Sequence, residues 1–358
     1  MAQQAHVRDT DNGGSPPESP RSGFRRLLSR PGPGGRCDKS WRDRGTWRRG
    51  LLLAAVALLL ALVMLAHARI PNAIGNLGSL TETFLPWLGL LVPVLLVLAV
   101  LRRSVTALVT ALVPVVVWLT MFGGLVTDKA DKAASRGDLT VATHNVNADN
   151  PDPSGTARDV AASGADVVAL EELTTAAVPT YEKALAATYP HHAVVGTVGL
   201  WSRYPLSGVR DVDILLGWKR AMRATVTTPV GQVAVYVAHL PSVRVKLEAG
   251  FTARQRDKSA DALGQAIAAE HLTRVVLLGD LNGTMNDRAL NAVTSQLRST
   301  QGAAGSGFGF SWPASFPMAR IDQIMVKGVE PESSWSLPQT GSDHLPIAAR
   351  VRVDTTAS

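Results

Sequence analysis

Three apolar stretches dominate the first third of the chain: Leu51 to Ala66, Phe84 to Leu101 and Val105 to Val126, none of which contains a charged residue. At about 1.5 Å of rise per residue, each of them crosses, or nearly crosses, a hydrocarbon core of about 30 Å as a helix. Buried core helices are the alternative, but such helices normally keep a polar face, and these stretches have none. The pattern therefore predicts three transmembrane helices within residues 51–126.

The pattern changes after residue 138, where short runs rich in Val, Leu and Ile alternate with helical stretches. The strand-like runs are Leu139 to Thr143, Val167 to Leu170, Val233 to His239, Val275 to Leu278 and Ile321 to Val326, and the helical stretches include Ala157 to Ala162 and Arg254 to Glu270. This alternation is typical of an α/β or α+β domain, which we place at residues 139–358, although it does not give the topology. Residues 127–138 are small and charged, and we expect a stalk there.

The N-terminal tail has a different composition. Residues 1–49 hold eleven Lys and Arg against five Asp and Glu, with frequent Pro, Gly and Ser. Such a segment cannot bury enough apolar surface to fold, so we predict a disordered basic tail over residues 1–50. Cys37, the only cysteine of the sequence, lies in this tail, so the domain at residues 139–358 has no disulfide to rely on.

Arginines flank the apolar stretches in a way that predicts their orientation. Arg48 and Arg49 precede the first stretch, and Arg102 and Arg103 separate the second from the third. By the positive-inside rule both pairs stay in the cytoplasm, which gives a multi-pass protein of the cell membrane with a cytoplasmic N-terminus and an extracytoplasmic domain. The small residues around His67 leave open a cleaved signal peptide at residues 51–66, but the second arginine pair would still fix the same orientation.

The net charge of +7 invites a nucleic-acid interpretation, but the charge is unevenly placed. Residues 128–358 hold twenty-two Lys and Arg against twenty-three Asp and Glu, so the predicted extracytoplasmic part has a net charge of −1. Domains that follow a nucleic-acid backbone usually present a basic face to the phosphates. The composition therefore gives no strong evidence for a nucleic-acid partner.

Acidic, amide and imidazole residues stand at the ends of the strand-like runs. They are Asn145, Glu171 and Glu172, His239, Asp280 and Asn282, Asp322, and Asp343 with His344. A rigid sheet presents such side chains together at its edge. Oxygen ligands of this kind suit Mg²⁺, which polarises phosphate oxygens, and the set indicates a divalent-metal phosphoesterase site.

In this order the segments around Thr143-His144-Asn145, Glu171-Glu172, Ala238-His239, Gly279-Asp280-Leu281-Asn282, Ile321-Asp322 and Ser342-Asp343-His344 resemble the endonuclease/exonuclease/phosphatase superfamily. The resemblance covers roughly residues 139 to 353. It implies a four-layer sandwich of two β-sheets flanked by helices, with the site at one end and Mg²⁺ or Mn²⁺ as the cofactor.

The resemblance also implies a role for each residue. Glu172 would be the principal metal ligand, with Asn145 and Asp343 beside it. His344 paired with Asp322 would be the general base, and Asp280 would orient the attacking water or share the metal. His239 would contact the phosphoryl group from the side opposite the general base. Asn145, Asn282 and Arg220 would also contact the phosphate, and Arg223 is the alternative to Arg220 for this contact. Two positions, Glu171 and Asn147, depart from the family's usual pattern.

The three apolar stretches, the basic turn and the outward domain together resemble a narrower actinobacterial group, the VanJ-type membrane proteins associated with teicoplanin resistance. This resemblance implies a phosphorylated membrane lipid as substrate, such as undecaprenyl diphosphate. Besides the lipid bilayer and this substrate, the sequence predicts no protein partner. The alternative is an extracytoplasmic nuclease or nucleotide phosphoesterase. The sequence leaves open whether a monoester or a diester is cleaved, whether one or two metals bind, and which oligomeric state forms.

Overall fold

The computed structural model describes residues 48, 50–73, 75–130, 138–242 and 250–353. The predicted basic tail therefore lies outside the described residues apart from Arg48 and Gly50, and so does most of the predicted stalk. Those two predictions stay predictions.

The apolar region forms helices α2 (Leu51–Ala66), α3 (Leu77–Thr83), α4 (Leu91–Leu101) and α5 (Val105–Val126), with 3₁₀ turns η1 (His67–Arg69) and η2 (Leu85–Leu90). Two helices in the described part of the chain, Leu51–Arg69 and Val105–Val126, are long and apolar enough to cross a membrane. A third span exists if α3 and the helical segment Leu85–Leu101, which are bent by 70° at their junction, count as one. The predicted second span is thus the longer arm of a bent pair.

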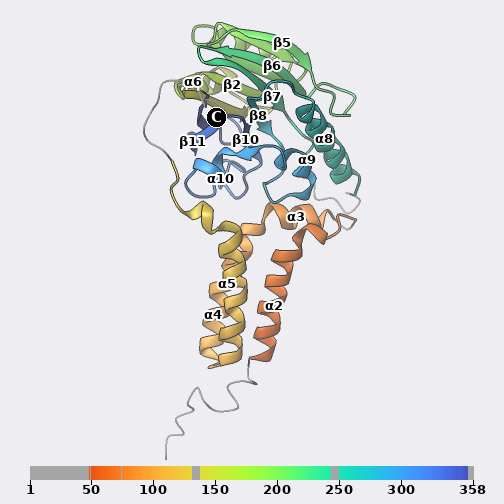
Figure 1. Cartoon of the computed structure of the whole chain (residues 1–358), viewed down its shortest axis with the longest axis vertical. Helices are drawn as coiled ribbons and strands as arrows, with labels where there is room; N and C mark the ends of the chain where they lie inside the picture. The colour runs from red at the N-terminus through yellow and green to blue at the C-terminus, as the bar shows by residue number, and fades with distance from the viewer. Residues whose placement is uncertain (1–47, 49, 74, 131–137, 243–249, 354–358) are drawn as a thin grey trace, which may run out of the picture. The chain divides into compact units, whose positions relative to one another are not determined.

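The apolar helices α2, α4 and α5 pack side by side around a small core that includes Ala57, Met64 and Val92 (Figure 1). Their outer faces carry large apolar side chains that nothing covers: Leu52 is 79% exposed and Leu101 is 74% exposed. A contiguous exposed apolar surface marks contact with lipid or with another protein. Because α2 and α5 are long enough to cross a membrane and α4 packs beside them, we interpret these exposed faces as lipid-facing.

The rest of the described chain builds two six-stranded sheets (Figure 1). The first has the order β11-β12-β1-β2-β4-β3, and the second has the order β5-β6-β7-β8-β10-β9. The strands are β1 (Asp138–Asn145), β2 (Val167–Glu171), β3 (His191–Val195), β4 (Val198–Ser202), β5 (Leu206–Asp211), β6 (Ala221–Thr228), β7 (Gly231–Ala238), β8 (Val275–Asp280), β9 (Arg298–Ser299), β10 (Asp322–Lys327), β11 (Glu330–Ser336) and β12 (Ile347–Arg352). Within this mixed arrangement, β1 pairs with β2 and β7 with β8 in parallel.

Helices cover the outer face of each sheet. They are α6 (Pro153–Ala162), α7 (Val178–Leu185), α8 (Gly250–Ala268) and α9 (Asn291–Thr294), with the 3₁₀ turn η3 (Arg288–Leu290). Helix α10 (Thr300–Ala304) instead contacts β11 of the first sheet and β9 and β10 of the second. Helix α6 begins where the sequence favours it, because Asp152 accepts a hydrogen bond from the amide of Gly155 at 2.8 Å and Pro153 occupies the first turn. One core forms between α6, α7 and the first sheet, and another forms between α8, α9 and the second sheet.

The two sheets pack face to face through a third core, which completes the predicted four-layer sandwich. Strand β8 shows how the sequence specifies it. Val276 and Leu278 point into the core between the sheets, whereas Val275 and Leu277 point toward the helices. Because both faces are buried, the strand is a continuous apolar run rather than an apolar and polar alternation.

The second sheet is tied to the end of α8 by a buried ion pair. Arg223 on β6 donates to Glu270 at 2.9 and 3.0 Å, and the Tyr236 hydroxyl donates to the same carboxylate at 2.9 Å. Burial alone would raise the pKa of Glu270, but these hydrogen bonds hold it at about 2, below its usual value of 4.5. The folded protein therefore stabilises the ionised form of Glu270 more than the unfolded chain does.

We expect this pair to make stability depend on pH. A depressed carboxyl pKa contributes stability above about pH 4.5, and that contribution is lost as the pH falls toward 2. Glu270→Gln should lower the thermal unfolding midpoint of the detergent-purified chain at neutral pH, and the difference from wild type should shrink over this window. Glu330→Gln is the matched control, because its ion pair with Arg298 is exposed and should contribute little. A constant difference from pH 7 to pH 2 would contradict the assignment.

Candidate active site

The period-two alternation of the strands brings the predicted residues to one place. On β1, β2, β7, β8 and β10 every second residue faces the core between the sheets. Continued to the strand ends, the same parity places Asn145, Glu171, His239, Asp280 and Asp322 on that inner face. The polar residues therefore gather at one end of the sandwich, between the two sheets.

Asp280 and Asp322 lie directly opposite each other in the antiparallel pair of β8 and β10. The approach of β7 to this point requires glycine before Asp280, since Gly279 has a φ of 142° and a side chain there would meet the Ala238 carbonyl at 1.9 Å. Burial and the neighbouring Asp322 carboxylate raise the pKa of Asp280 to about 7. Two carboxylates in one buried place favour a bound proton or a cation between them.

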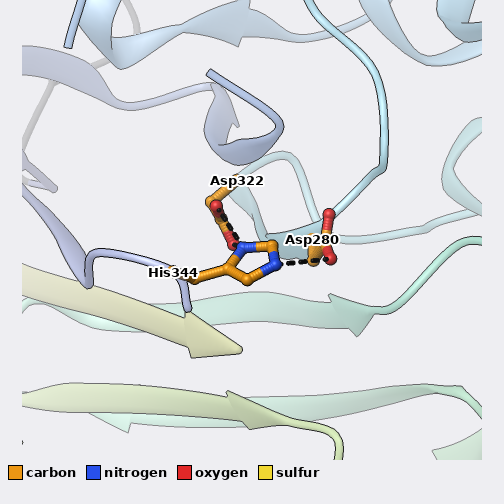
Figure 2. Close-up of side chains that lie close together, drawn as sticks. All are labelled: Asp280, Asp322 and His344. Carbon is orange, nitrogen blue, oxygen red and sulfur yellow. Dashed lines mark hydrogen bonds and ion pairs between the residues drawn. The ribbon is translucent and has the colours of Figure 1, made fainter. Parts of the chain in front are cut away.

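His344 lies between these two carboxylates (Figure 2). Its Nδ1 is 2.9 Å from Asp322 Oδ2, and its Nε2 is 3.9 Å from Asp280 Oδ2. Burial alone would lower the pKa of His344, but Asp322, followed by Asp280 and Asp343, raises it to about 10. The pKa of Asp322, which burial alone would raise, is held below its usual range by the His344 charge. The predicted pair of His344 and Asp322 is thus in hydrogen-bond contact.

His239 approaches Asp280 from another direction. Its Nε2 lies 3.6 Å from Asp280 Oδ2 and 3.6 Å from Glu172 Oε1, and the Arg220 guanidinium contacts its ring. Burial and the nearby Arg220 charge lower the pKa of His239 well below its usual value, so this imidazole is neutral. Arg220 also lies over the Trp218 ring at 4.8 Å. One neutral and one charged imidazole therefore flank the same carboxylate.

The two predicted asparagines position Asp280. Asn145 donates to Asp280 Oδ2 at 3.0 Å, and its own amide oxygen accepts the Asn147 amide at 3.0 Å. Asn282 donates from its side chain to Asp280 Oδ2 at 3.1 Å and to the Leu240 carbonyl at 2.9 Å. Both amide hydrogens of Asn282 are thus used within the protein, and its predicted contact with phosphate stays a prediction.

Glu172 reaches the site through an unusual backbone conformation. If β2 continued as a strand, residue 172 would face the helix-covered side, opposite to Glu171. Glu172 instead has a φ of 61°, which is uncommon outside glycine, and its carboxylate accepts the Ala148 amide at 3.1 Å while approaching His239. Such conformations cluster at functional sites.

A pocket of about 400 Å³ contains Glu172, Arg220, His239, Asp280, Asn282, Asp343 and His344, together with Thr83, Ser242, Trp312 and Ile321. Its donors fit a divalent cation: Glu172 and Asp343 border the same space, and ligand atoms of Asp280, Asp322 and His344 lie within 4.8 Å of one another. A cation held there by Glu172, Asp343 and Asn145 would polarise phosphate oxygens and neutralise developing charge. The residues around it would orient water through Asp280 and hold the phosphate through His239 and Arg220.

Two arginines compete for the phosphate in the sequence, and the structure separates them. Arg220 borders the pocket, whereas Arg223 is 6% exposed and bound to Glu270 on the far side of the sheet. Alternation explains this, because β6 places Met222 and Ala224 toward the intersheet core and Arg223 away from it.

Three further residues belong to the surroundings of the site. Glu171 is fully buried, its carboxyl accepts the Thr143 hydroxyl at 2.8 Å, and burial raises its pKa well above its usual value, which favours the neutral form. His144 bonds Thr340 at 2.8 Å, and burial lowers its pKa to about 3. Trp312 borders the pocket although sequence reasoning did not select it. One sequence signal could have pointed to Trp312: small and aromatic residues alternate in Gly307-Phe308-Gly309-Phe310-Ser311-Trp312.

Comparison with known proteins identifies the fold and its family. The sequence profile of the Endonuclease/Exonuclease/phosphatase family matches residues 142–344, which includes every predicted site residue. The chain belongs to this family. Members of the family hydrolyse phosphate esters and depend on divalent metals. No curated protein sequence matches the chain significantly.

Solved structures agree with the family fold. The structure of D. rerio TDP2 complexed with single strand DNA product is 19% identical, with a TM-score of 0.51 over 60% of this chain and 98% of that chain. A humanized D. rerio TDP2 is 21% identical, with a TM-score of 0.50 over 60% and 99% of the two chains. The beta toxin of Staphylococcus aureus is 14% identical, with a TM-score of 0.50 over 59% and 99%. At these identities the likeness shows a shared fold.

We predict that Glu172→Gln lowers turnover of bis(p-nitrophenyl) phosphate by about a hundredfold or more, the scale for losing one preorganised charged group. The same variant should bind Mg²⁺ more weakly in calorimetry while unfolding at the wild-type temperature, because the strand core does not include Glu172. Glu182→Gln, a surface glutamate on α7, is the matched control and should change neither quantity. Wild-type metal affinity in Glu172→Gln would remove this residue from the metal site.

Proposed function

We propose that the protein is a membrane-anchored, divalent-metal-dependent phosphoesterase that hydrolyses phosphate esters or diphosphates of membrane lipids, such as undecaprenyl diphosphate, at the outer face of the membrane. In this assignment Glu172, Asp343 and Asn145 hold Mg²⁺ or Mn²⁺. A cation there would lower the pKa of His344, so that the pair of His344 and Asp322 could accept a proton from water oriented by Asp280. His239 and Arg220 would meet the phosphate, and Asn282 would join them if it released one of its present hydrogen bonds. The resemblance to VanJ-type proteins extends the proposal to glycopeptide resistance.

One observation carries the lipid assignment: the pocket that holds the catalytic cluster is also bordered by Thr83, the last residue of α3. Helix α3 belongs to the bent pair that makes the third candidate span. A headgroup site with a wall from a membrane-associated segment favours a substrate that arrives from the membrane.

Helix α3 is fastened to the domain by buried contacts. Arg256 on α8 is 1% exposed and donates to the Ser79 hydroxyl at 3.1 Å and to Asp287 at 3.0 Å. The same guanidinium donates to the Asn282 carbonyl at 2.8 Å, and Thr284 donates to the Glu82 carbonyl at 3.2 Å. One arginine thus joins the membrane-associated helix to the loop that carries a predicted site residue.

The second candidate function is an extracytoplasmic nuclease or nucleotide phosphoesterase. Its support is the shared fold with D. rerio TDP2, which was solved with a single strand DNA product. Against it stands the net charge of −1 over residues 128–358, since backbone-binding domains gain much of their affinity from basic residues.

We predict that the full-length protein in detergent with Mg²⁺ releases phosphate from undecaprenyl diphosphate and cleaves duplex DNA little, because the site takes one headgroup and the domain lacks excess positive charge. Phospholipids and inositol phosphates complete the panel, and EDTA is the control for metal dependence. Rapid degradation of DNA at physiological salt without lipid phosphate release would favour the nuclease instead.

The proposed orientation predicts opposite results for two fusions. An alkaline phosphatase reporter joined after residue 127 should be active, because α5 would carry it to the outer face, and one joined at Arg102 should be inactive. A cytoplasmically active reporter such as β-galactosidase at the same two positions should give the reverse pattern and serves as the control. Activity of the first reporter at Arg102 alone would place the domain in the cytoplasm.

A further inference from the structure

An apolar groove lies between η2, α4, α5 and the segment that follows α10. It has a volume of about 350 Å³, within the range of ligand pockets, and its accessible lining is almost wholly apolar. Its walls include Trp87, Leu90, Trp118, Leu119, Phe308 and Phe310, and we call it the aromatic groove. Because most of its walls belong to candidate membrane-spanning segments, hydrocarbon chains of the bilayer have direct access to it.

Stacked aromatic rings and hydrogen bonds build the walls of the groove. Phe310 stacks on Trp87 with ring centroids 5.7 Å apart and on Phe308 with centroids 5.1 Å apart. The Trp87 indole donates to the Met318 carbonyl at 2.7 Å, and the Trp118 indole donates to the Pro86 carbonyl at 2.8 Å. With both polar indole groups already bonded, the rings offer only apolar surface to a ligand.

The aromatic groove and the catalytic pocket are connected through a second pocket that shares lining residues with both. A second pocket of about 340 Å³ shares Pro86, Phe308 and Phe310 with the groove, and it shares Thr83 with the catalytic pocket. The covalent path agrees, because Phe310 is followed by Ser311 and by Trp312 of the catalytic pocket. Ser311 accepts the amide of Leu345, which follows His344, at 2.7 Å. The groove and the catalytic loop are therefore held in a fixed relation.

We infer that the aromatic groove binds the hydrocarbon chain of the phosphorylated lipid whose headgroup occupies the catalytic pocket. The inference rests on the proposed lipid phosphoesterase function and adds where the chain is recognised. A ligand that is anionic at one end and apolar along its length matches the two linked surfaces. A nucleotide can stack its base on aromatic rings, but it has no long hydrocarbon chain, and its charged phosphates would lose hydration among candidate membrane-spanning segments. Recognition of the chain makes the enzyme selective for long-chain lipid phosphates over short soluble ones.

The kinetic test fills the groove without touching the catalytic pocket. Leu119→Trp enlarges a side chain that borders the groove and is 53% exposed, and Leu112→Trp is its control, two turns earlier on α5, 52% exposed and outside the groove. We expect Leu119→Trp to raise KM for undecaprenyl diphosphate in mixed micelles about tenfold, the low end for a change in a hydrophobic pocket. Turnover of isopentenyl diphosphate, which carries the same diphosphate on a short chain, should equal that of wild type and thereby show that the variant is folded. Leu112→Trp should change neither substrate.

A binding test separates this inference from the proposed function. A diazirine-bearing polyprenyl diphosphate, irradiated with the full-length protein in EDTA, should label peptides that contain residues 86–93, 115–119 or 308–310, and Leu119→Trp should reduce that labelling. Labelling of the groove without hydrolysis in Mg²⁺ would retain the groove assignment and overturn the function. Hydrolysis with labelling elsewhere and with Leu119→Trp indistinguishable from Leu112→Trp would overturn the groove alone. Equal labelling by a diazirine phosphatidylcholine would make the groove a site for ordinary bilayer lipid and overturn the inference.

Discussion

The face-to-face packing of the two sheets is the constraint on which the rest of the structure depends. Burial on both faces fixes the register of each central strand, since a shift of one residue would move a polar strand end into the helix layer. That register determines which residue arrives at the inner edge of each strand. The candidate site continues the apolar core by one more inward-facing residue on each strand: on that face Asp280 follows Leu278, and His239 follows Val237.

The cluster concentrates charge in a place with little water. Asp280 and Asp322 oppose each other across a strand pair, and His344 between them takes up a proton to reduce the repulsion. His239 stays neutral beside the Arg220 charge. Negative and positive groups therefore alternate around Asp280, with His344 between Asp280 and Asp322 and with Glu172 beside His239. A bound cation would compensate the carboxylates, and a phosphate would compensate Arg220.

Much of this was available from the sequence, for physical reasons. Val275 to Leu278 and Val167 to Leu170 are continuous apolar runs because both faces are buried, and the polar residue after each run marks the edge of the core. Other strands escaped prediction: β5, at the edge of the second sheet, is mostly exposed, and β12, between β11 and β1, contains alternating arginines, so neither has a continuous apolar run. Helix α3 was not predicted either, since Leu77–Thr83 has too few apolar residues to show the spacing of an amphipathic helix.

Parts of the site depend on contacts that no local pattern encodes. The position of Glu172 follows from one left-handed residue after a strand, and the pocket wall at Thr83 comes from a segment far from the catalytic motifs. The contribution of Thr83 means that the pocket depends on a segment that precedes α5. A protease that cut the chain after α5 would release a fragment that keeps the candidate site residues of the two sheets but lacks Thr83 and with it one side of their pocket. The site of the released fragment would therefore differ from the site of the intact chain.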